Sequence, residues 1–161
     1  ENSWTEGYDL IKKILVAFDG SEHAYKALDF ALDLAEKYSA TVTIINVFQA
    51  PIIPMAGYLT EGELYAYPAT YDDFVKELKV AHEKMLSHAL KRAKRLKPNL
   101  EVSTLLKEGR PADEIVKTAK EENFDLIVIG HRGLGRVKEF FLGSVSNRVA
   151  DEARCPVLIV K

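Results

Sequence analysis

The stretch DLIVIGHRGLGRVKEFFLGS, residues 125–144, joins an apolar run to a glycine-rich segment. Residues 126–129 are continuously apolar and few in number, which is typical of a strand buried on both faces of a sheet. Glycines recur between residues 130 and 143, and a short helical pattern begins near Ser144. A buried strand, a glycine-rich loop and a helix in this order indicate an α/β protein with a parallel sheet.

The same alternation continues toward both ends of the chain. Short apolar runs predict further strands at residues 13–19, 41–48, 102–106 and 157–160. Helices are predicted after a Ser21 N-cap, over a periodic stretch that includes Phe74 to Leu96, from Pro111, and near Ser144. We therefore predict a single three-layer α/β/α sandwich whose five-stranded parallel sheet is covered on both faces.

Residues 49–70 interrupt this rhythm. Prolines and glycines punctuate the stretch, and Tyr58, Tyr65 and Tyr67 add aromatic side chains. The sequence predicts a long connection here, and long connections in compact domains are often functional. Two roles stay open for it, a lid over a ligand site or a surface for a protein partner.

Composition restricts the class of protein. The chain has 161 residues and a net charge of −2, which predict one domain with no general attraction to nucleic acid or anionic lipid. We assign residues 1–12 to an N-terminal extension and 13–161 to the domain. No apolar run approaches the roughly 20 residues that span a bilayer. The polar N-terminus resembles no secretory signal and Cys155 is the only cysteine, so we expect a cytoplasmic location and no membrane association.

Two strand ends carry residues suited to binding a ligand. Open parallel sheets bind ligands beyond the carboxyl ends of their strands, and here Asp19 ends the first strand and Gly130 the fourth. Glycine lets a backbone approach an anion closely and adopt positive φ, and a helix N-terminus attracts phosphate. Arg132 adds positive charge, and Ser144 and Ser146 offer hydroxyl donors. Together these features predict a phosphate site.

Simpler explanations of each feature stay open. Glycines in such a loop can serve only to make turns, Ser144 can be only an N-cap, and Asp19 can cap the turn that follows it. Competing motifs are absent from the sequence, because no GxxxxGK[ST] run occurs and Lys138 replaces the third glycine of a dinucleotide fingerprint. His131 can reach a phosphate or face solvent, and the histidine spacing predicts no metal site.

The spacing G-x2-G-x9-G-[ST] resembles the ATP-binding signature of the universal stress proteins, and Gly130, Gly133, Gly143 and Ser144 fill it without a gap. Other segments are similar to parts of that family. They are ILVAFDGS at 14–21, GRPADEI at 109–115, DLIVIG at 125–130 and CPVLIV at 155–160. The resemblance covers the chain from about Lys13 to Lys161.

This resemblance implies a strand order of 3-2-1-4-5, the adenine nucleotide alpha hydrolase-like arrangement. It also implies an adenine nucleotide, ATP or a relative such as AMP, with Mg²⁺ bridging its phosphates. Asp19 would face the ribose side, and Val47 would meet the adenine through its backbone. The residues implied along the ribose and phosphate path are Ile129, Gly130, Arg132, Gly133, Gly143, Ser144, Val145 and Ser146.

The resemblance favours a nucleotide-dependent regulator or sensor in a stress response, acting on a protein partner that the sequence does not identify. A slow ATPase and an interaction module that keeps the fold without the nucleotide are the alternatives. No residue is assigned a catalytic role, because hydrolysis needs an oriented water and the loop offers no convincing base. The apolar strand Val157–Val160 is implied at a sheet edge, where the family resemblance suggests a homodimer.

Overall fold

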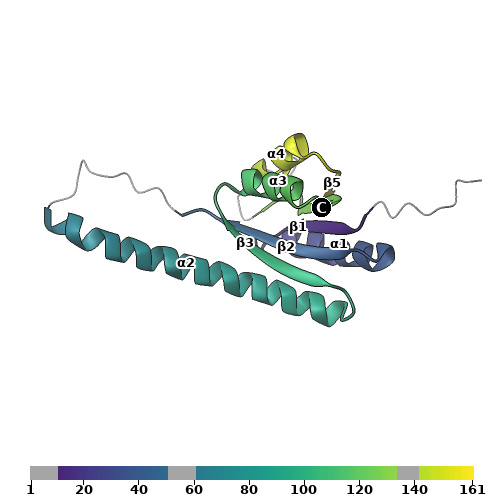
Figure 1. Ribbon diagram of the computed structural model, residues 1–161, viewed down its shortest axis with the longest axis horizontal. Helices are drawn as coiled ribbons and strands as arrows, with labels where there is room; N and C mark the ends of the chain where they lie inside the picture. The colour runs from purple at the N-terminus through teal and green to yellow at the C-terminus, as the bar shows by residue number, and fades with distance from the viewer. Residues whose placement is uncertain (1–10, 51–60, 134–141) are drawn as a thin grey trace, which may run out of the picture.

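The described residues of the computed structural model are 11–50, 61–133 and 142–161. Strands and helices alternate along these residues (Figure 1). In chain order they are β1 (Lys13–Ala17), α1 (Glu22–Tyr38), β2 (Thr41–Phe48), α2 (Glu61–Leu96), β3 (Val102–Glu108), α3 (Pro111–Glu121), β4 (Leu126–Gly130), α4 (Ser144–Glu152) and β5 (Val157–Val160). The predicted alternation is confirmed.

The five strands form one parallel sheet of order β3-β2-β1-β4-β5, as expected. The chain builds outward from β1 to β3 on one side, then crosses to β4 and β5 on the other. Strand order therefore reverses beside β1, whose Ala17 pairs with Ile129 of β4. The carboxyl ends of β1 and β4 diverge at such a reversal and leave a crevice.

Helices cover both faces of the sheet, α1 and α2 on one side and α3 and α4 on the other (Figure 1). Successive strand residues point to opposite faces, so Ile14 and Val16 pack under α1 while Leu15 and Ala17 pack toward α3. Because both faces are buried, the strands are continuously apolar rather than alternating.

The connection from β1 to α1 combines a turn with a helix cap. The Ser21 Oγ accepts a hydrogen bond of 3.1 Å from the Ala24 N–H, which confirms Ser21 as the N-cap. Gly20 before it has φ +81°, a conformation in which a side chain would be strained. The chain thus leaves β1 after Ala17 and enters α1 at Glu22.

One predicted boundary was wrong. Helix α2 begins at Glu61, well before Phe74, so the expected connection over 49–70 is partly helical. Proline lacks an N–H donor and normally disfavours a helix interior, but helix-forming residues such as Glu63, Leu64 and Ala66 precede Pro68. Helix α4 begins at Ser144, as expected, and its N-cap is Gly143 rather than Ser144.

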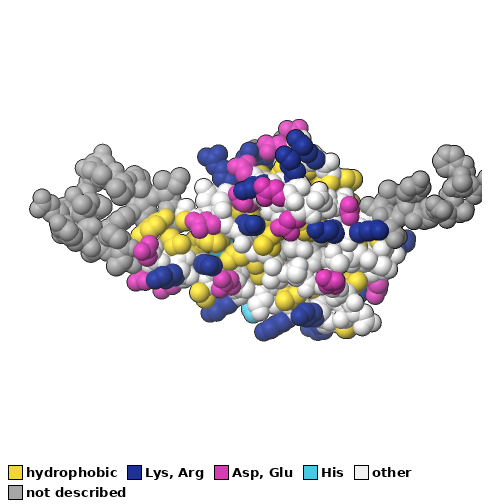
Figure 2. Space-filling view, in the orientation of Figure 1, with side chains coloured by type: hydrophobic (Ala, Val, Ile, Leu, Met, Phe, Trp, Pro, Cys, Tyr) yellow, Lys and Arg dark blue, Asp and Glu magenta, His cyan; other side chains and the backbone are white. Residues whose placement is uncertain are grey.

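Some predictions concern segments that the structure does not describe. Residues 1–10 and 51–60 lie outside the described residues, so the N-terminal extension and the lid or docking role stay predictions. Across the described ranges, no helix is long and apolar enough to cross a bilayer. On the described part of the face in Figure 2, basic and acidic side chains are intermixed rather than gathered by sign.

Candidate functional site

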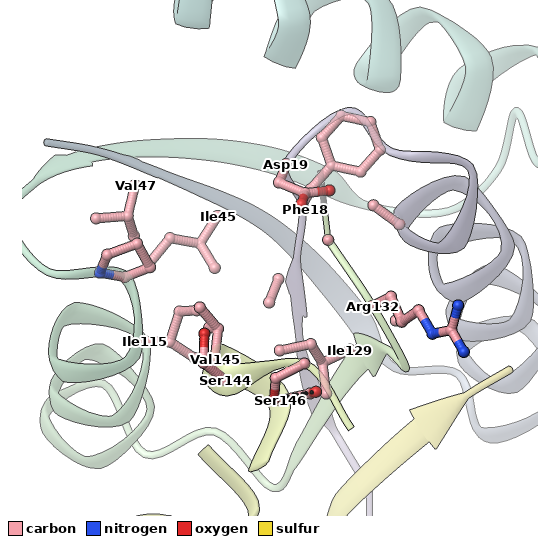
Figure 3. A pocket seen from close by; sticks show the side chains of 16 residues that line it. Phe18, Asp19, Ile45, Val47, Ile115, Ile129, Arg132, Ser144, Val145 and Ser146 are labelled. Atoms are coloured by element: carbon pink, nitrogen blue, oxygen red, sulfur yellow. Dashed lines mark hydrogen bonds between the residues drawn. The ribbon is translucent and has the colours of Figure 1, made fainter. Parts of the chain in front are cut away.

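A cavity of about 210 Å³ lies at the carboxyl ends of β1 and β4 (Figure 3). It opens to solvent and is somewhat smaller than the roughly 300 Å³ at which sites for drug-sized ligands begin, so a nucleotide-sized ligand would extend beyond it. The structure brings all the residues predicted from sequence to its wall. They are Asp19, Val47, Ile129, Gly130, Arg132, Gly133, Gly143, Ser144, Val145 and Ser146.

One part of the cavity wall is apolar. Ile45 and Val47 of β2, Ile115 of α3 and Val145 of α4 contribute aliphatic side chains, and Phe18 lies beyond β1 (Figure 3). Ile45 and Ile115 are buried within the core on the α3 side of the sheet. A wall of this kind suits the faces of a flat, apolar ring.

The N-terminus of α4 forms a second part of the wall. Its N-cap is Gly143, which provides no side-chain cap, and the first turn contains no acidic residue. The first helical hydrogen bond runs from the Asn147 N–H to the Gly143 carbonyl, at 2.9 Å. The N–H groups of Ser144, Val145 and Ser146 therefore lack intrahelical acceptors. An anion would find both free donors and the positive end of the helix dipole here.

The Ser146 hydroxyl is engaged within the protein. Its Oγ lies 3.0 Å from the carbonyl oxygen of His131 and 3.0 Å from that of Gly143, to which its single proton can be donated. The side-chain donation to phosphate that the sequence suggested is therefore in competition with these carbonyls. Ser144, by contrast, is exposed and has no hydrogen-bond partner among the described residues, so it is the better hydroxyl donor for a ligand.

Asp19 combines a capping role with a place in the cavity wall. Its Oδ1 accepts a hydrogen bond of 3.0 Å from the Ser21 N–H, so the capping explanation holds. Its other oxygen, Oδ2, faces Gly133, where an added Cβ would collide with it. The Asp19 carboxylate, which follows β1, and the loop after β4 thus lie close together across the crevice.

Arg132 is part of the wall, and its guanidinium group points away from the aliphatic side chains of the wall (Figure 3). Its Nε is buried and has no hydrogen-bond partner in the described part of the chain. Burial, and then the neighbouring positive charge of Arg132, lower the pKa of His131. His131 is not part of the cavity wall. The cavity therefore gives no support to a contact between His131 and a phosphate. Arg136 and Lys138 lie outside the described residues.

Six further wall residues were not predicted from sequence as ligand contacts. They are Ala17, Phe18, Ala24, Ile45, Pro111 and Ile115. Ile115 was assigned to the buried face of a helix, which is correct, but only the packing of α3 against β2 brings that face to the cavity. Apolar residues of this kind carry no sequence signal that separates a cavity wall from a core.

The fold and the cavity define a doubly wound α/β protein with a crevice at the point where its strand order reverses. A family model described as the universal stress protein family matches residues 10–161. The chain belongs to the universal stress protein family.

Individual relatives resemble the chain over most of its length. The universal stress protein YxiE of Bacillus subtilis is 38% identical over 152 residues, which cover 94% of this chain and 100% of that protein. A universal stress protein family structure from Burkholderia pseudomallei superposes with a TM-score of 0.69 at 28% identity, over 96% of this chain and 98% of that one. A crystal structure of a universal stress protein in complex with cAMP superposes with a TM-score of 0.63 at 26% identity, over 93% and 96%.

Proposed function

We propose that the protein binds an adenine nucleotide, preferably ATP, in the cavity between β1 and β4. The observation that carries this proposal is the composition of one continuous wall. Aliphatic side chains of Ile45, Val47 and Ile115 lead toward the uncapped N-terminus of α4 and the Arg132 side chain. A nucleotide has the same order of groups, with a flat base at one end and anionic phosphates at the other. The family relative in complex with cAMP agrees with an adenine ligand.

Each part of the wall has a role in this proposal. Val47 would meet the base through its backbone, and Asp19 would face the ribose. Ile129, Gly130 and Gly133 would line the path from ribose to phosphates. Phosphate oxygens would accept hydrogen bonds from the N–H groups of Ser144, Val145 and Ser146 and from the Ser144 hydroxyl, with Arg132 balancing their charge.

The wall suits a magnesium ion that arrives with the nucleotide. No cluster of three potential protein ligands for a metal occurs among the described residues, and Asp19 is the one carboxylate in the cavity wall. Mg²⁺ commonly keeps waters and binds through phosphates and one or two carboxylates. The ion would therefore be held mainly by phosphate oxygens and would neutralise part of their charge.

Binding with a regulatory output fits this wall better than catalysis. The only general-base candidate in the wall is Asp19, whose Oδ1 already accepts the Ser21 N–H. We infer that nucleotide occupancy changes a surface recognised by a protein partner in a stress response. The nucleotide thereby acts as a signal rather than as a substrate.

The purified protein is expected to melt at a higher temperature in the presence of ATP and Mg²⁺. A ligand at a hundred times its dissociation constant adds about 2.7 kcal/mol to the free energy of unfolding. Differential scanning fluorimetry measures the shift, and chromatography of the heat-denatured protein detects co-purified nucleotide. Absence of both, at millimolar ATP, would refute the proposed function.

We also propose a homodimer formed through β5. This strand lies at the edge of the sheet, where unpaired backbone groups invite another strand. The carbonyls of Pro156 and Val160 accept hydrogen bonds from the β4 side, so the N–H of Ile159 points outward by the alternation of strand geometry. Light scattering is expected to give the mass of a dimer, and Ile159→Pro to give a monomer, because proline removes that donor.

The dimer proposal has a clear contrary outcome. A wild-type monomer at micromolar concentration contradicts it, as does an Ile159→Pro variant that stays dimeric. Circular dichroism of the variant separates loss of pairing from loss of fold.

A further inference from the structure

Asn46 is a polar side chain buried in the apolar layer beneath α2. It is 2% exposed and belongs to β2. Its Nδ2 donates a hydrogen bond of 2.7 Å to the carbonyl oxygen of Phe18, the residue that follows β1. Its Oδ1 lies 2.6 Å from Nδ1 of His82 on α2. Buried amides are costly unless both ends are paired, and Asn46 pairs both.

This amide stands where the hydrogen-bond ladder between β1 and β2 ends. The last backbone bond between them runs from the Phe18 N–H to the Ile45 carbonyl, at 2.9 Å. In a regular parallel ladder, the next bond would run from the Val47 N–H to the Phe18 carbonyl. The Asn46 side chain takes that carbonyl instead.

The backbone of Val47 is therefore available at the cavity. Backbone groups of successive strand residues point to alternate sides. Val42 donates to Glu101 before β3, whereas Thr41 donates to Lys12 and Ile45 accepts from Phe18, both on the β1 side. Val47 consequently directs its N–H and its carbonyl toward β1, and no backbone hydrogen bond joins them to a described residue there. Its side chain belongs to the cavity wall.

Helix α2 fixes the orientation of the Asn46 amide. Because Nδ2 must donate to the Phe18 carbonyl, Oδ1 is the atom that faces His82, and His82 must carry its proton on Nδ1. The His82 ring lies 5.6 Å from the Phe48 ring, and burial lowers the pKa of His82. The Sδ of Met85, about one turn further along α2, would lie 3.0 Å from a Cβ added to Gly20, so α2 packs close to the loop that carries Asp19.

We propose that Asn46, oriented by His82, is a positioning residue that keeps β1 and β2 apart and thereby leaves the Val47 backbone free to read the base. This inference rests on the proposed nucleotide site and identifies what sets its base specificity. The amide acts through Val47, since it lies on the opposite face of the sheet from the cavity.

The free backbone pair discriminates by hydrogen-bond polarity. Adenine presents an exocyclic amino donor where guanine presents a carbonyl acceptor. A carbonyl and an N–H held at fixed positions can satisfy one of these patterns and not the other. A site that loses this pair keeps its phosphate contacts and loses its preference for adenine.

The test compares ATP, GTP and inorganic tripolyphosphate by titration calorimetry with Mg²⁺ present. Asn46→Ala frees the Phe18 carbonyl for Val47, so we expect affinity for ATP to fall about tenfold relative to GTP, as expected for one or two lost hydrogen bonds. Tripolyphosphate, which engages only the α4 end, should bind as in the wild type. His82→Leu should also lower the affinity for ATP relative to GTP, but by a smaller factor. This variant replaces Asn46→Ala in the test if Asn46→Ala does not fold.

Two further variants of α2 complete the design. His82→Gln can still donate to Oδ1 and should restore the ATP preference. His88→Leu, at an exposed position of the same helix, should behave as wild type. Equal losses for ATP, GTP and tripolyphosphate would show a merely structural role and overturn the inference, and so would an unchanged preference.

Amide exchange of Val47 separates this inference from the proposed function. Without a partner, the Val47 N–H should exchange quickly in the wild type, and about tenfold more slowly in Asn46→Ala once it pairs with Phe18. Unchanged exchange overturns the positioning role whatever the nucleotide result. If the wild type binds no nucleotide but Asn46→Ala still slows Val47 exchange, the nucleotide site and its base recognition are overturned. The role of Asn46 in separating the strands is then retained.

Discussion

Replacing Gly133 with valine is expected to abolish the thermal stabilisation by ATP. An added Cβ at this position collides with Oδ2 of Asp19, so the loop after β4 must move away from β1 and the crevice changes shape. At a hundredfold excess over the dissociation constant, the lost stabilisation is about 2.7 kcal/mol, or roughly 5–10 °C of melting temperature for a domain of this size. Fluorimetry with and without ATP and Mg²⁺ measures it.

The collision involves a side-chain oxygen at an exposed glycine, so the loop can yield and the fold should survive. Unfolding in urea should give a free energy within about 0.5 kcal/mol of wild type, the usual range for surface substitutions. Gly143→Ala is the control for the stability measurement alone, because the nearest contacts of its Cβ would be 3.4 Å, to the His131 carbonyl and the Ser146 hydroxyl, which is ordinary packing. An ATP shift that persists in Gly133→Val argues against the loop as part of the site.

The predictable parts of the fold are those in which a local rule and the tertiary structure agree. The apolar runs became strands of one sheet, since strands buried on both faces must be apolar throughout. Ser21 is an N-cap because its hydroxyl oxygen accepts a hydrogen bond from the nearby Ala24 N–H. The start of α2 was not predictable, because helix propensity around Pro68 outweighed the breaks that proline and glycine suggested.

The residues of the cavity wall were predicted from the spacing of the glycine motif more than from physical arguments about each residue. Glycines at 130, 133 and 143 were expected to serve partly through positive φ, and the structure corrects this. Among the described glycines, only Gly20 and Gly109 have positive φ. The three loop glycines matter for space instead. Neither Asn46 nor Ile115 carried a sequence signal, since a buried amide and a core isoleucine acquire their roles only when β1, β2 and α3 meet.

Gly130→Ala is expected to destabilise the fold itself, in contrast to the change at Gly133. A Cβ on Gly130 would lie 2.8 Å from both the carbonyl carbon and the carbonyl oxygen of His23. These are backbone atoms of the first turn of α1, which cannot turn aside as a flexible side chain can. We expect a loss of about 2–3 kcal/mol in the free energy of unfolding, the upper range for overpacked cores, measured by urea denaturation.

Because of the backbone conformation at Gly130, this substitution tests only the steric overlap of the added Cβ. Gly130 does not have positive φ, so alanine is not strained there and would by itself stabilise the chain by about 0.4–1 kcal/mol through the unfolded state. A net loss must therefore come from the contact with α1. If Gly130→Ala is as stable as Gly143→Ala, the close approach of α1 to β4 is not what requires glycine, and the first glycine of the signature must instead be explained by the ligand.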